Sequence, residues 1–225
     1  MLKKHMDFAS QNKEEYMETL KGLPVANAIN EKIIEEMKDW KGAIPHLAIV
    51  RVGERPDDMS YERGATKKME KVGFRCTSYT FPADIDNDTF QKEFDKINED
   101  EDIDGILLLR PLPKHLDEKA IENRIASVKD LDGISPMNLA KVYAGDPTGY
   151  GPCTAEAVIE MLDYAGVDLK GKRAVIIGRS LVIGKPVAMM LMKKNATVTV
   201  CHTKTVDMPG AVSYTHLTLP TNSRV

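Results

Sequence analysis

The chain has 225 residues, of which 42% are hydrophobic and 29% are charged, and its net charge at pH 7 is -3. This length is enough for one large domain or two modest domains with real cores, and the charge gives no basic surface that would indicate a nucleic-acid partner. No stretch approaches the roughly 18 apolar residues of a membrane span, and the N-terminus lacks the apolar run of a signal peptide. Cys76, Cys153 and Cys201 lie far apart and form no CxxC pair. Neither a zinc site nor a disulfide framework is therefore expected, and a reducing cytoplasm is the predicted location.

The first half of the chain alternates helical and strand patterns. The elements expected in chain order are a helix within 11–41, a strand at 46–53, a helix over 59–72, a strand at 75–83, a helix over 86–100 and a strand at 104–113. Tyr61 lies at the start of the second helix and Gly73 closes it, while Asn87 or Asp88 is the expected N-cap of the third. Strands that alternate with helices predict a parallel α/β sheet, and the apolar third strand is expected to be buried on both faces.

The second half begins with an irregular stretch. Gly, Pro and Asp are frequent in residues 128–153, as is typical of a site-bearing loop and a domain connection. The elements expected after it are a helix at 154–166, a strand at 172–178, a helix at 183–195 and a strand at 197–202. The last three form one βαβ unit, which is the start of a nucleotide-binding sheet.

The last fifteen residues, 211–225 (AVSYTHLTLPTNSRV), do not continue this alternation. They contain three threonines, no acidic residue and no helical period. They resemble the translated sequencing-adapter tails that remain on some assembled gene fragments. We therefore expect a non-native tail that takes no part in the fold. The alternative is a genuine terminus that is loose, as termini often are.

Residues 178–186 (GRSLVIGKP) connect a predicted strand to a predicted helix, where the helix N-terminus would face a phosphate. Five residues separate the two glycines and a proline follows the lysine, so the motif is not the P-loop of a nucleotide kinase. A serine at the second glycine position also distinguishes it from GxGxxG. A tight turn without a ligand is the alternative interpretation. Arg179 and Ser180 favour a phosphate site, because they offer a cation and a hydroxyl for phosphate oxygens.

Two further motifs bear polar or rigid groups. Residues 129–133 (KDLDG) place two carboxylates two positions apart, so in an extended loop both would share one side; a solvated acidic turn is the alternative. Residues 110–113 (RPLP) fix the backbone at the end of a buried strand and would form a wall for a flat ligand. His46, His115 and His202 have no partner at metal-ligand spacing and are expected to be structural.

Six segments taken together resemble the methylenetetrahydrofolate dehydrogenase/cyclohydrolase family. In chain order they are SYERGATKKMEKVGF, DGILLLRPLPKHL, KDLDGISPMNLAKV, GPCTAEAVIEML, GRSLVIGKPVAMML and ATVTVCHTKT. GRSxxVGxP, here with Ile183 at the valine position, and KDxDG are highly specific together. The resemblance implies an α/β fold with an N-terminal three-layer α/β catalytic domain (1–150) and a partial Rossmann-type cofactor domain (151–210), followed by the expected non-native tail 211–225.

The resemblance also implies a folate site in the cleft between the two domains of the family. Tyr61 would stack against the ring system of a tetrahydrofolate substrate. Asp132 would hydrogen-bond the pterin edge, where a carboxylate can take two N–H donors side by side. Pro111 and Pro113 would form the wall of the folate site. Tyr61 and Asp132 are accordingly the expected catalytic residues.

For the cofactor, the resemblance implies a phosphate site at the helix mouth. Arg179 and Ser180 would bind the phosphate, and Gly178 and Gly184 would allow close approach of the backbone. Thr203 falls where the family usually has a serine near the 2′-phosphate of NADP. Because a hydroxyl is kept there, NADP is the expected cofactor, with NAD as the alternative.

Two departures from the family pattern concern the chemistry. The family has Tyr, three residues and then Lys on one helical face, but in this chain the lysine position is Ala65, and the unchanged distance from Tyr61 to Gly73 excludes a register slip. The glutamine that partners this lysine is replaced by Leu109. Hydride transfer needs positioning more than an acid or base, whereas cyclohydrolysis needs managed proton transfers. We therefore predict a dehydrogenase of one-carbon metabolism and purine biosynthesis that has lost its cyclohydrolase activity.

Two other functions remain open at this point. A bifunctional dehydrogenase/cyclohydrolase would need Arg110 or Lys68 to replace the lysine, although an arginine stays protonated and cannot act as a base. A non-catalytic folate-binding or dimer-partner module is the alternative of another class. The family forms homodimers largely through the cofactor domain, and its later strands and final helix are not recognisable in this chain. The chain is therefore expected to bind NADP weakly, and its dimerisation is in doubt.

Overall fold

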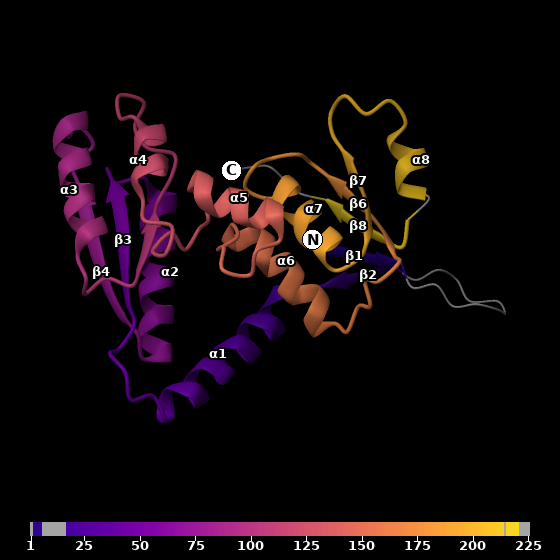
Figure 1. Cartoon of the computed structure of the whole chain (residues 1–225), viewed down its shortest axis with the longest axis horizontal. Coiled ribbons are helices and arrows are strands. Elements are labelled where there is room, and N and C mark those ends of the chain that lie inside the picture. Colours follow the sequence, from indigo (N-terminus) through magenta and orange to yellow (C-terminus); the bar gives the residue numbers. More distant parts are fainter. Residues whose placement is uncertain (1, 6–16, 214, 221–225) are drawn as a thin grey trace. The chain divides into compact units, whose positions relative to one another are not determined.

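The computed structural model describes residues 2–5, 17–213 and 215–220. These residues form two compact units, one of Ala28–Ala140 and one that combines the residues up to Asn27 with those from Lys141 onward (Figure 1). Both units are α/β, as the sequence predicts. The units divide after Asn27 and after Ala140, so the N-terminal segment belongs to the second unit. The domain boundary at residue 150 stays a prediction.

The first unit is a sheet between helices. Its elements, with the helices that lead into and out of it, are α1 (Gly22–Lys38), β3 (His46–Val52), α2 (Pro56–Val72), β4 (Arg75–Phe81), α3 (Asn87–Glu99), β5 (Gly105–Leu108), α4 (Glu118–Arg124) and α5 (Pro136–Ala144). The strand order is β4-β3-β5, and both pairings are parallel. Figure 1 shows α2 and α3 on opposite sides of the strands, which gives the predicted three layers.

The alternation of β3 explains these layers. Successive side chains of a strand point to opposite faces, so one set of β3 residues meets α3 and the other meets α2. The main core cluster contains Ala48, Val50 and Val52 of β3, Phe90, Phe94 and Ile97 of α3, and Ile121 of α4. The α3 residues recur at helical spacing, which directs one apolar stripe of that helix at the sheet.

The ends of α2 and α3 follow local capping rules. Pro56 occupies the start of α2, and Gly73, with φ 82°, ends it in the left-handed conformation, as predicted. The prediction of Asn87 or Asp88 as the N-cap of α3 is wrong. The cap is Asp86, which has extended backbone and accepts a hydrogen bond from the backbone N–H of Thr89 at 2.9 Å.

The predicted strand at 104–113 is shorter in the structure, because β5 ends at Leu108. The edge of β5 is covered by a loop segment that forms a parallel bridge between Ile106 and Asp130. The backbone N–H of Ile106 donates to Lys129, and that of Leu131 donates back to Ile106. This segment satisfies backbone groups that an open edge strand would expose.

The second unit contains a larger mixed sheet. Its elements are β1 (Leu2–His5), β2 (Met17–Leu20), α6 (Cys153–Tyr164), β6 (Arg173–Ile177), α7 (Gly184–Lys193), β7 (Thr197–Cys201), α8 (Met208–Ser213) and β8 (Leu217–Pro220). The strand order is β2-β1-β8-β6-β7. Strands β6, β7 and β8 are mutually parallel, whereas β1 pairs antiparallel with β2 and β8. The predicted βαβ unit is present as β6, α7 and β7.

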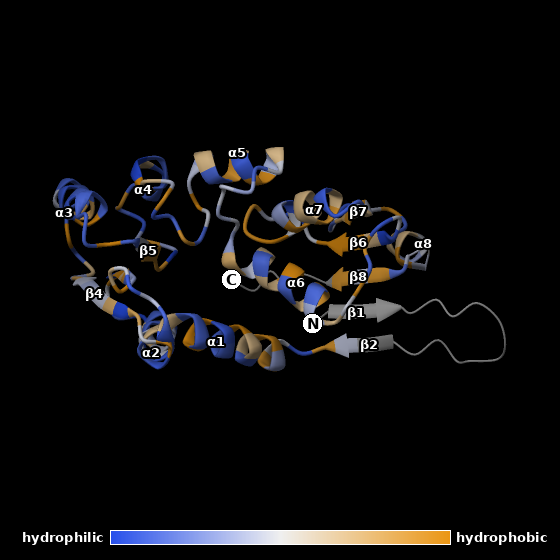
Figure 2. Ribbon diagram, turned by 60° about the horizontal axis from the view of Figure 1, so that its bottom comes forward, coloured by the Kyte–Doolittle hydropathy of each residue, from blue (hydrophilic) through white to orange (hydrophobic). Residues whose placement is uncertain are grey.

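Two segments differ from the sequence prediction. Residues 17–20 form strand β2 where a helix was predicted, and the helix begins only at Gly22; residues 11–16 of that predicted helix lie outside the described residues. Residues 217–220, expected to take no part in the fold, form β8 beside β6, with Leu217 and Leu219 buried. Figure 2 shows hydrophobic colouring along both β6 and β8. Both differences have one physical cause, because a short segment adopts the strand conformation when a sheet offers it a partner. The non-native origin of residues 211–225 stays a prediction.

Candidate functional sites

Helix α2 carries the first group of predicted site residues. Tyr61, Ala65 and Met69 are four residues apart, so they lie on one face of the helix. The helix starts just after the carboxyl end of β3, and Tyr61 is therefore nearest that end of the strand. Its side chain is 57% exposed, whereas Ala65 and Met69 pack against buried residues of the sheet. Tyr61 thus leaves an aromatic surface accessible at the edge of the unit.

The positions of Ala65 and Leu109 belong to one hydrophobic cluster. Its buried members are Leu47, Ile49 and Leu109, and the residues packed against them are Ala65, Met69, Cys76, Leu107 and Leu131. We refer to these eight residues as the apolar cluster. A charged ammonium or an amide placed among them would lose water without gaining a polar partner. The two positions where the resemblance expects a lysine and a glutamine are therefore both apolar and share one packed region.

The turn that follows β5 is held by charged groups of α4. The backbone N–H of Leu112 donates to Glu118 Oε2 at 2.7 Å. The Arg110 guanidinium forms an ion pair with Glu122 at 2.9 Å and lies 3.6 Å from Glu118 Oε1. Arg110 is thus engaged by this helix. Pro111, which follows a cis peptide bond, is exposed, and Pro113 is half-buried.

The two carboxylates of KDLDG differ in environment. Asp130 is fully buried and accepts hydrogen bonds from the backbone N–H groups of Ile134 and Ser135 and from Asn138 Nδ2, at 2.8–3.0 Å. Asp132 is half-buried. The expectation that both carboxylates share one side of an extended loop is wrong, because the chain turns at Asp130 and closes hydrogen bonds around its side chain. Of the two, Asp132 is the carboxylate left at partial exposure.

Sequence reasoning missed an ion pair next to Tyr61. Arg51 of β3 and Glu62 of α2 form it with side chains only 11% and 15% exposed. Burial raises the pKa of Glu62, but hydrogen bonds from Ser78 and Arg51 and the charge of Arg51 outweigh it and leave the pKa lowered. A charged residue inside an otherwise apolar strand was the available signal, since such a residue needs a buried partner.

In the second unit the predicted phosphate turn is shaped by backbone. Gly178 has φ 136°, a conformation that favours glycine, and a Cβ on Gly184 would lie 2.2 Å from the carbonyl oxygen of Gly178. The hydroxyl of Ser180 accepts the backbone N–H of Ile183 at 3.0 Å, which fixes the entry to α7. The turn therefore brings two backbone segments closer together than any side chain would allow.

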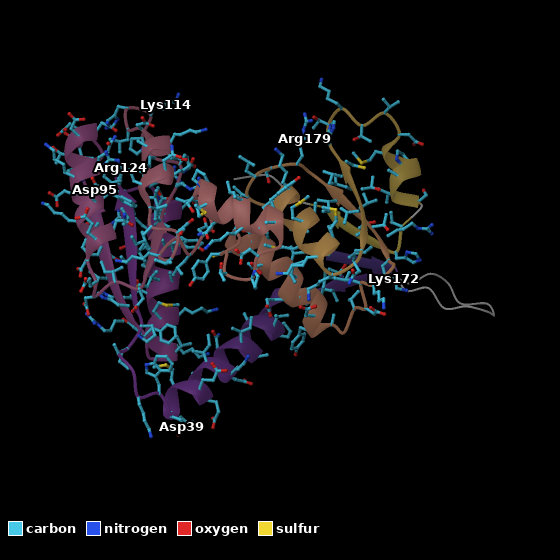
Figure 3. All side chains as sticks on the ribbon, viewed as in Figure 1. Asp39, Asp95, Lys114, Arg124, Lys172 and Arg179 are labelled. Carbon is cyan, nitrogen blue, oxygen red and sulfur yellow. The ribbon has the colours of Figure 1, made fainter. Side chains whose placement is uncertain are left out.

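The remaining cofactor candidates lie around this turn. Strands β6 and β7 end at the same level, with Ile177 paired to Cys201, so the loops that follow them leave the same edge of the sheet. Arg179 in the first loop, which Figure 3 labels, and Thr203 in the second loop are both exposed. A close backbone turn at a helix N-terminus with a nearby cation and hydroxyl suits the phosphate of a dinucleotide. The residues present therefore fit such a cofactor.

Each group of candidates belongs to a single unit. Tyr61, Pro111, Pro113 and Asp132 belong to the first unit, and the candidates between Gly178 and Thr203 belong to the second. Their individual roles stay predictions. In the part of the chain that the structure describes, no cluster of His, Cys, Asp or Glu could hold a metal ion, and no helix is long and apolar enough to cross a membrane.

The fold and the glycine turn define a class of α/β proteins with a Rossmann-like nucleotide-binding domain. Comparison with protein families makes this specific. Residues 20–132 match the tetrahydrofolate dehydrogenase/cyclohydrolase catalytic domain, and residues 152–218 match the NAD(P)-binding domain of the same family. The chain therefore belongs to the tetrahydrofolate dehydrogenase/cyclohydrolase family.

Individual relatives agree with this assignment. The bifunctional protein FolD of Clostridium kluyveri is 48% identical over 191 residues, which cover 84% of this chain and 67% of the relative. The FolD structure from Trypanosoma brucei, complexed with NADP cofactor and inhibitor, aligns with a TM-score of 0.82 at 33% identity and covers 91% of this chain and 71% of that one. The bifunctional FolD from Campylobacter jejuni aligns with a TM-score of 0.79 at 35% identity, covering 83% and 67%. The chain thus spans about two thirds of the length of these relatives.

Proposed function

We propose that the protein is a methylenetetrahydrofolate dehydrogenase that uses NADP and has lost the cyclohydrolase activity of its relatives. The first part is supported by the family membership and by the relative complexed with NADP. The observation that carries the second part is the apolar cluster, which contains both Ala65 and Leu109. We further propose that the enzyme works in the cytoplasm.

On the folate side, the exposed ring of Tyr61 provides a flat apolar surface against which the substrate ring system stacks. Asp132 accepts N–H groups of the pterin edge, and Pro111 and Pro113 restrict the opposite side with a rigid backbone. These residues orient the bridging methylene carbon of the substrate. Orientation is the main requirement of a hydride transfer, because the lone pair of the adjacent substrate nitrogen supports the developing cation.

On the cofactor side, the close turn at Gly178 and Gly184 lets a phosphate approach the N-terminus of α7, and Arg179 and the hydroxyl of Ser180 bind it. Thr203 supplies a hydroxyl for the 2′-phosphate, which favours NADP over NAD. When bound, the nicotinamide cofactor supplies the hydride acceptor. The contribution of the chain is to hold that acceptor in place and to exclude competing reactions.

The cyclohydrolase step, unlike the hydride transfer, needs groups that assist proton transfer. Water must add to the methenyl product, and general acid–base assistance for the proton transfers is typically worth about 10²–10⁴-fold in rate. The side chains that could replace the lysine are poorly suited to this task. Arg110 is engaged by Glu118 and Glu122, and an arginine does not act as a base. Lys67 and Lys68 are exposed on α2 rather than packed in the apolar cluster.

The test is to assay the two half-reactions separately. Oxidation of methylenetetrahydrofolate is followed by reduction of NADP, and hydrolysis of methenyltetrahydrofolate by its absorbance, each against an enzyme-free control. We expect oxidation of methylenetetrahydrofolate, slowed in this chain by weak binding of NADP, and no hydrolysis of methenyltetrahydrofolate. Hydrolysis well above the uncatalysed rate would instead support the bifunctional alternative, which the names of the relatives favour. Folate binding without either activity would support the non-catalytic alternative.

A further inference from the structure

Arg55 connects the two segments of the first unit that carry the proposed folate contacts. It stands immediately before α2, the helix of Tyr61. Its guanidinium donates to the backbone carbonyl of Pro111 at 3.0 Å and reaches that of Arg110 at 3.4 Å. One side chain therefore links the start of the helix to the turn that contains Pro111 and Pro113.

The turn needs such a partner because it has left the sheet. The last strand-like hydrogen bond runs from the backbone N–H of Leu109 to the carbonyl of Val50 at 2.9 Å. Beyond it, the N–H of Leu112 is bound by Glu118 of α4. The carbonyls of Arg110 and Pro111 accept hydrogen bonds from the guanidinium of Arg55. Charge-assisted hydrogen bonds of this kind are stronger than neutral ones and hold a defined geometry.

Asp58 orients the guanidinium of Arg55. Its side chain is 10% exposed, and its Oδ1 accepts from Arg55 Nη2 at 2.8 Å. Asp58 lies in the first turn of α2, where a negative charge is also favourable for the helix. A planar guanidinium can donate hydrogen bonds to this carboxylate and to the carbonyls of the turn at the same time. The ammonium of a lysine is a compact point charge without this fork of donors. The three partners thus require arginine in particular.

We propose that Arg55 is a positioning residue of the folate site, acting on the substrate through Tyr61, Pro111 and Pro113. It fixes the separation between the aromatic platform and the proline wall before the substrate arrives. This inference rests on the proposed function, because the folate roles of those three residues do. It predicts that loss of Arg55 weakens folate binding while cofactor binding in the other unit is unaffected.

The test measures binding of tetrahydrofolate to the full chain by calorimetry, for the unaltered protein and for R55A, R55K and D58N. We expect R55A to weaken binding about 10- to 100-fold, because the side chains of Tyr61, Pro111 and Pro113 would then have to be ordered during association. R55K and D58N are expected to fall between R55A and the unaltered protein. R75A is the matched control, because Arg75 is 48% exposed against 45% for Arg55 and also pairs with an aspartate, but lies at the amino end of β4.

The outcomes separate this inference from the function on which it rests. If the unaltered chain does not bind tetrahydrofolate, the proposed function fails and this inference fails with it. If the unaltered chain binds and R55A, R55K and D58N bind equally well, the inference alone is overturned. It is also overturned if R75A weakens binding as much as R55A, because the effect would then be a general loss of stability. Melting temperatures of all variants accompany the titrations, and R55K and D58N decide the matter if R55A does not fold.

Discussion

The apolar cluster beside α2 consists of packed side chains, whereas the turn between β6 and α7 depends on close contact between backbone atoms. In the apolar cluster, side chains fill the region, and Ala65 and Leu109 occupy the positions where the resemblance implies a lysine and a glutamine. In the turn, backbone meets backbone, since a Cβ on Gly184 would lie 2.2 Å from the carbonyl oxygen of Gly178. A region built from side chains can change its chemistry while the fold survives. A region built from backbone contact tolerates no substitution, so its function and its fold are lost together.

The largest effect is expected where the turn is altered. G184A forces the new methyl group into the Gly178 carbonyl, and the turn must open. We expect the free energy of unfolding to fall by about 3 kcal/mol and any binding of NADP to be lost. Urea denaturation and NADP titration measure the two quantities. The control is G64A in α2, where a Cβ meets nothing within 4 Å, and where alanine should stabilise the helix by about 0.5–1 kcal/mol. Unchanged stability of G184A would remove the contrast between the two regions.

The next effect concerns the apolar cluster. A65K combined with L109Q restores the polar pair, and we expect cyclohydrolase activity to rise about 100-fold over the unaltered protein. The same variant should be less stable by about 2 kcal/mol, because position 109 is only 8% exposed and the amide would be buried there. Hydrolysis of methenyltetrahydrofolate and urea denaturation check both statements. L109M serves as the control, since it preserves volume and adds no polar group. If the double variant folds but shows no cyclohydrolase activity, then residues other than those at positions 65 and 109 must also prevent this reaction.

The smallest effect on stability is expected for the ion pair between Arg51 and Glu62, which lies on α2 and β3 beside the apolar cluster. E62Q leaves Arg51 without its charged partner, and we expect the free energy of unfolding to fall by about 1–1.5 kcal/mol near neutral pH, just above the values typical of exposed pairs. Because the folded-state pKa of Glu62 is lowered from its ordinary value of 4.5, its contribution is fully present above that value. It is lost as the pH falls through the lowered pKa.

Urea denaturation of E62Q and the unaltered protein at several pH values checks this. The stability difference should be constant above the ordinary pKa and should shrink in more acidic buffer. E93Q is the control, because Glu93 pairs with Lys96 in solvent, with side chains 40% and 69% exposed. Its effect should stay within about 0.5 kcal/mol at every pH. A stability difference for E62Q that grows on acidification would contradict the lowered pKa of Glu62.

The regular elements were predictable where the pattern is local. The segments of β3, β4, β6 and β7 have the length of strands and are rich in apolar, β-branched or aromatic residues, and Gly73 and the glycine turn mark helix boundaries. Strand β8 was not predictable, because its partners β6 and β1 lie far away in the sequence. Strand β2 has its partner β1 nearby, but its four residues carry no strand pattern of their own. The N-cap of α3 was ambiguous among three consecutive Asp and Asn residues, and only backbone geometry selects Asp86.

The candidate site shows the same limit. Tyr61, Ala65 and Met69 share a helix face by spacing alone, so this part was predictable. The spacing of Asp130 and Asp132 was misleading, because a turn separates their environments. The contacts of Arg55 with the turn after β5 span more than fifty residues of sequence, and no local pattern encodes them.

The buried carboxylate of Asp130 has a consequence for the energetics of ligand capture. Its hydrogen bonds with Ile134, Ser135 and Asn138 close the loop around it, and Asn138 Nδ2 also bonds the carbonyl of Ser127. The loop that presents Asp132 is therefore ordered before any ligand arrives. The conformational entropy of that loop is lost during folding and not again during association, so more of the energy of the proposed contact between Asp132 and the substrate would remain available as affinity.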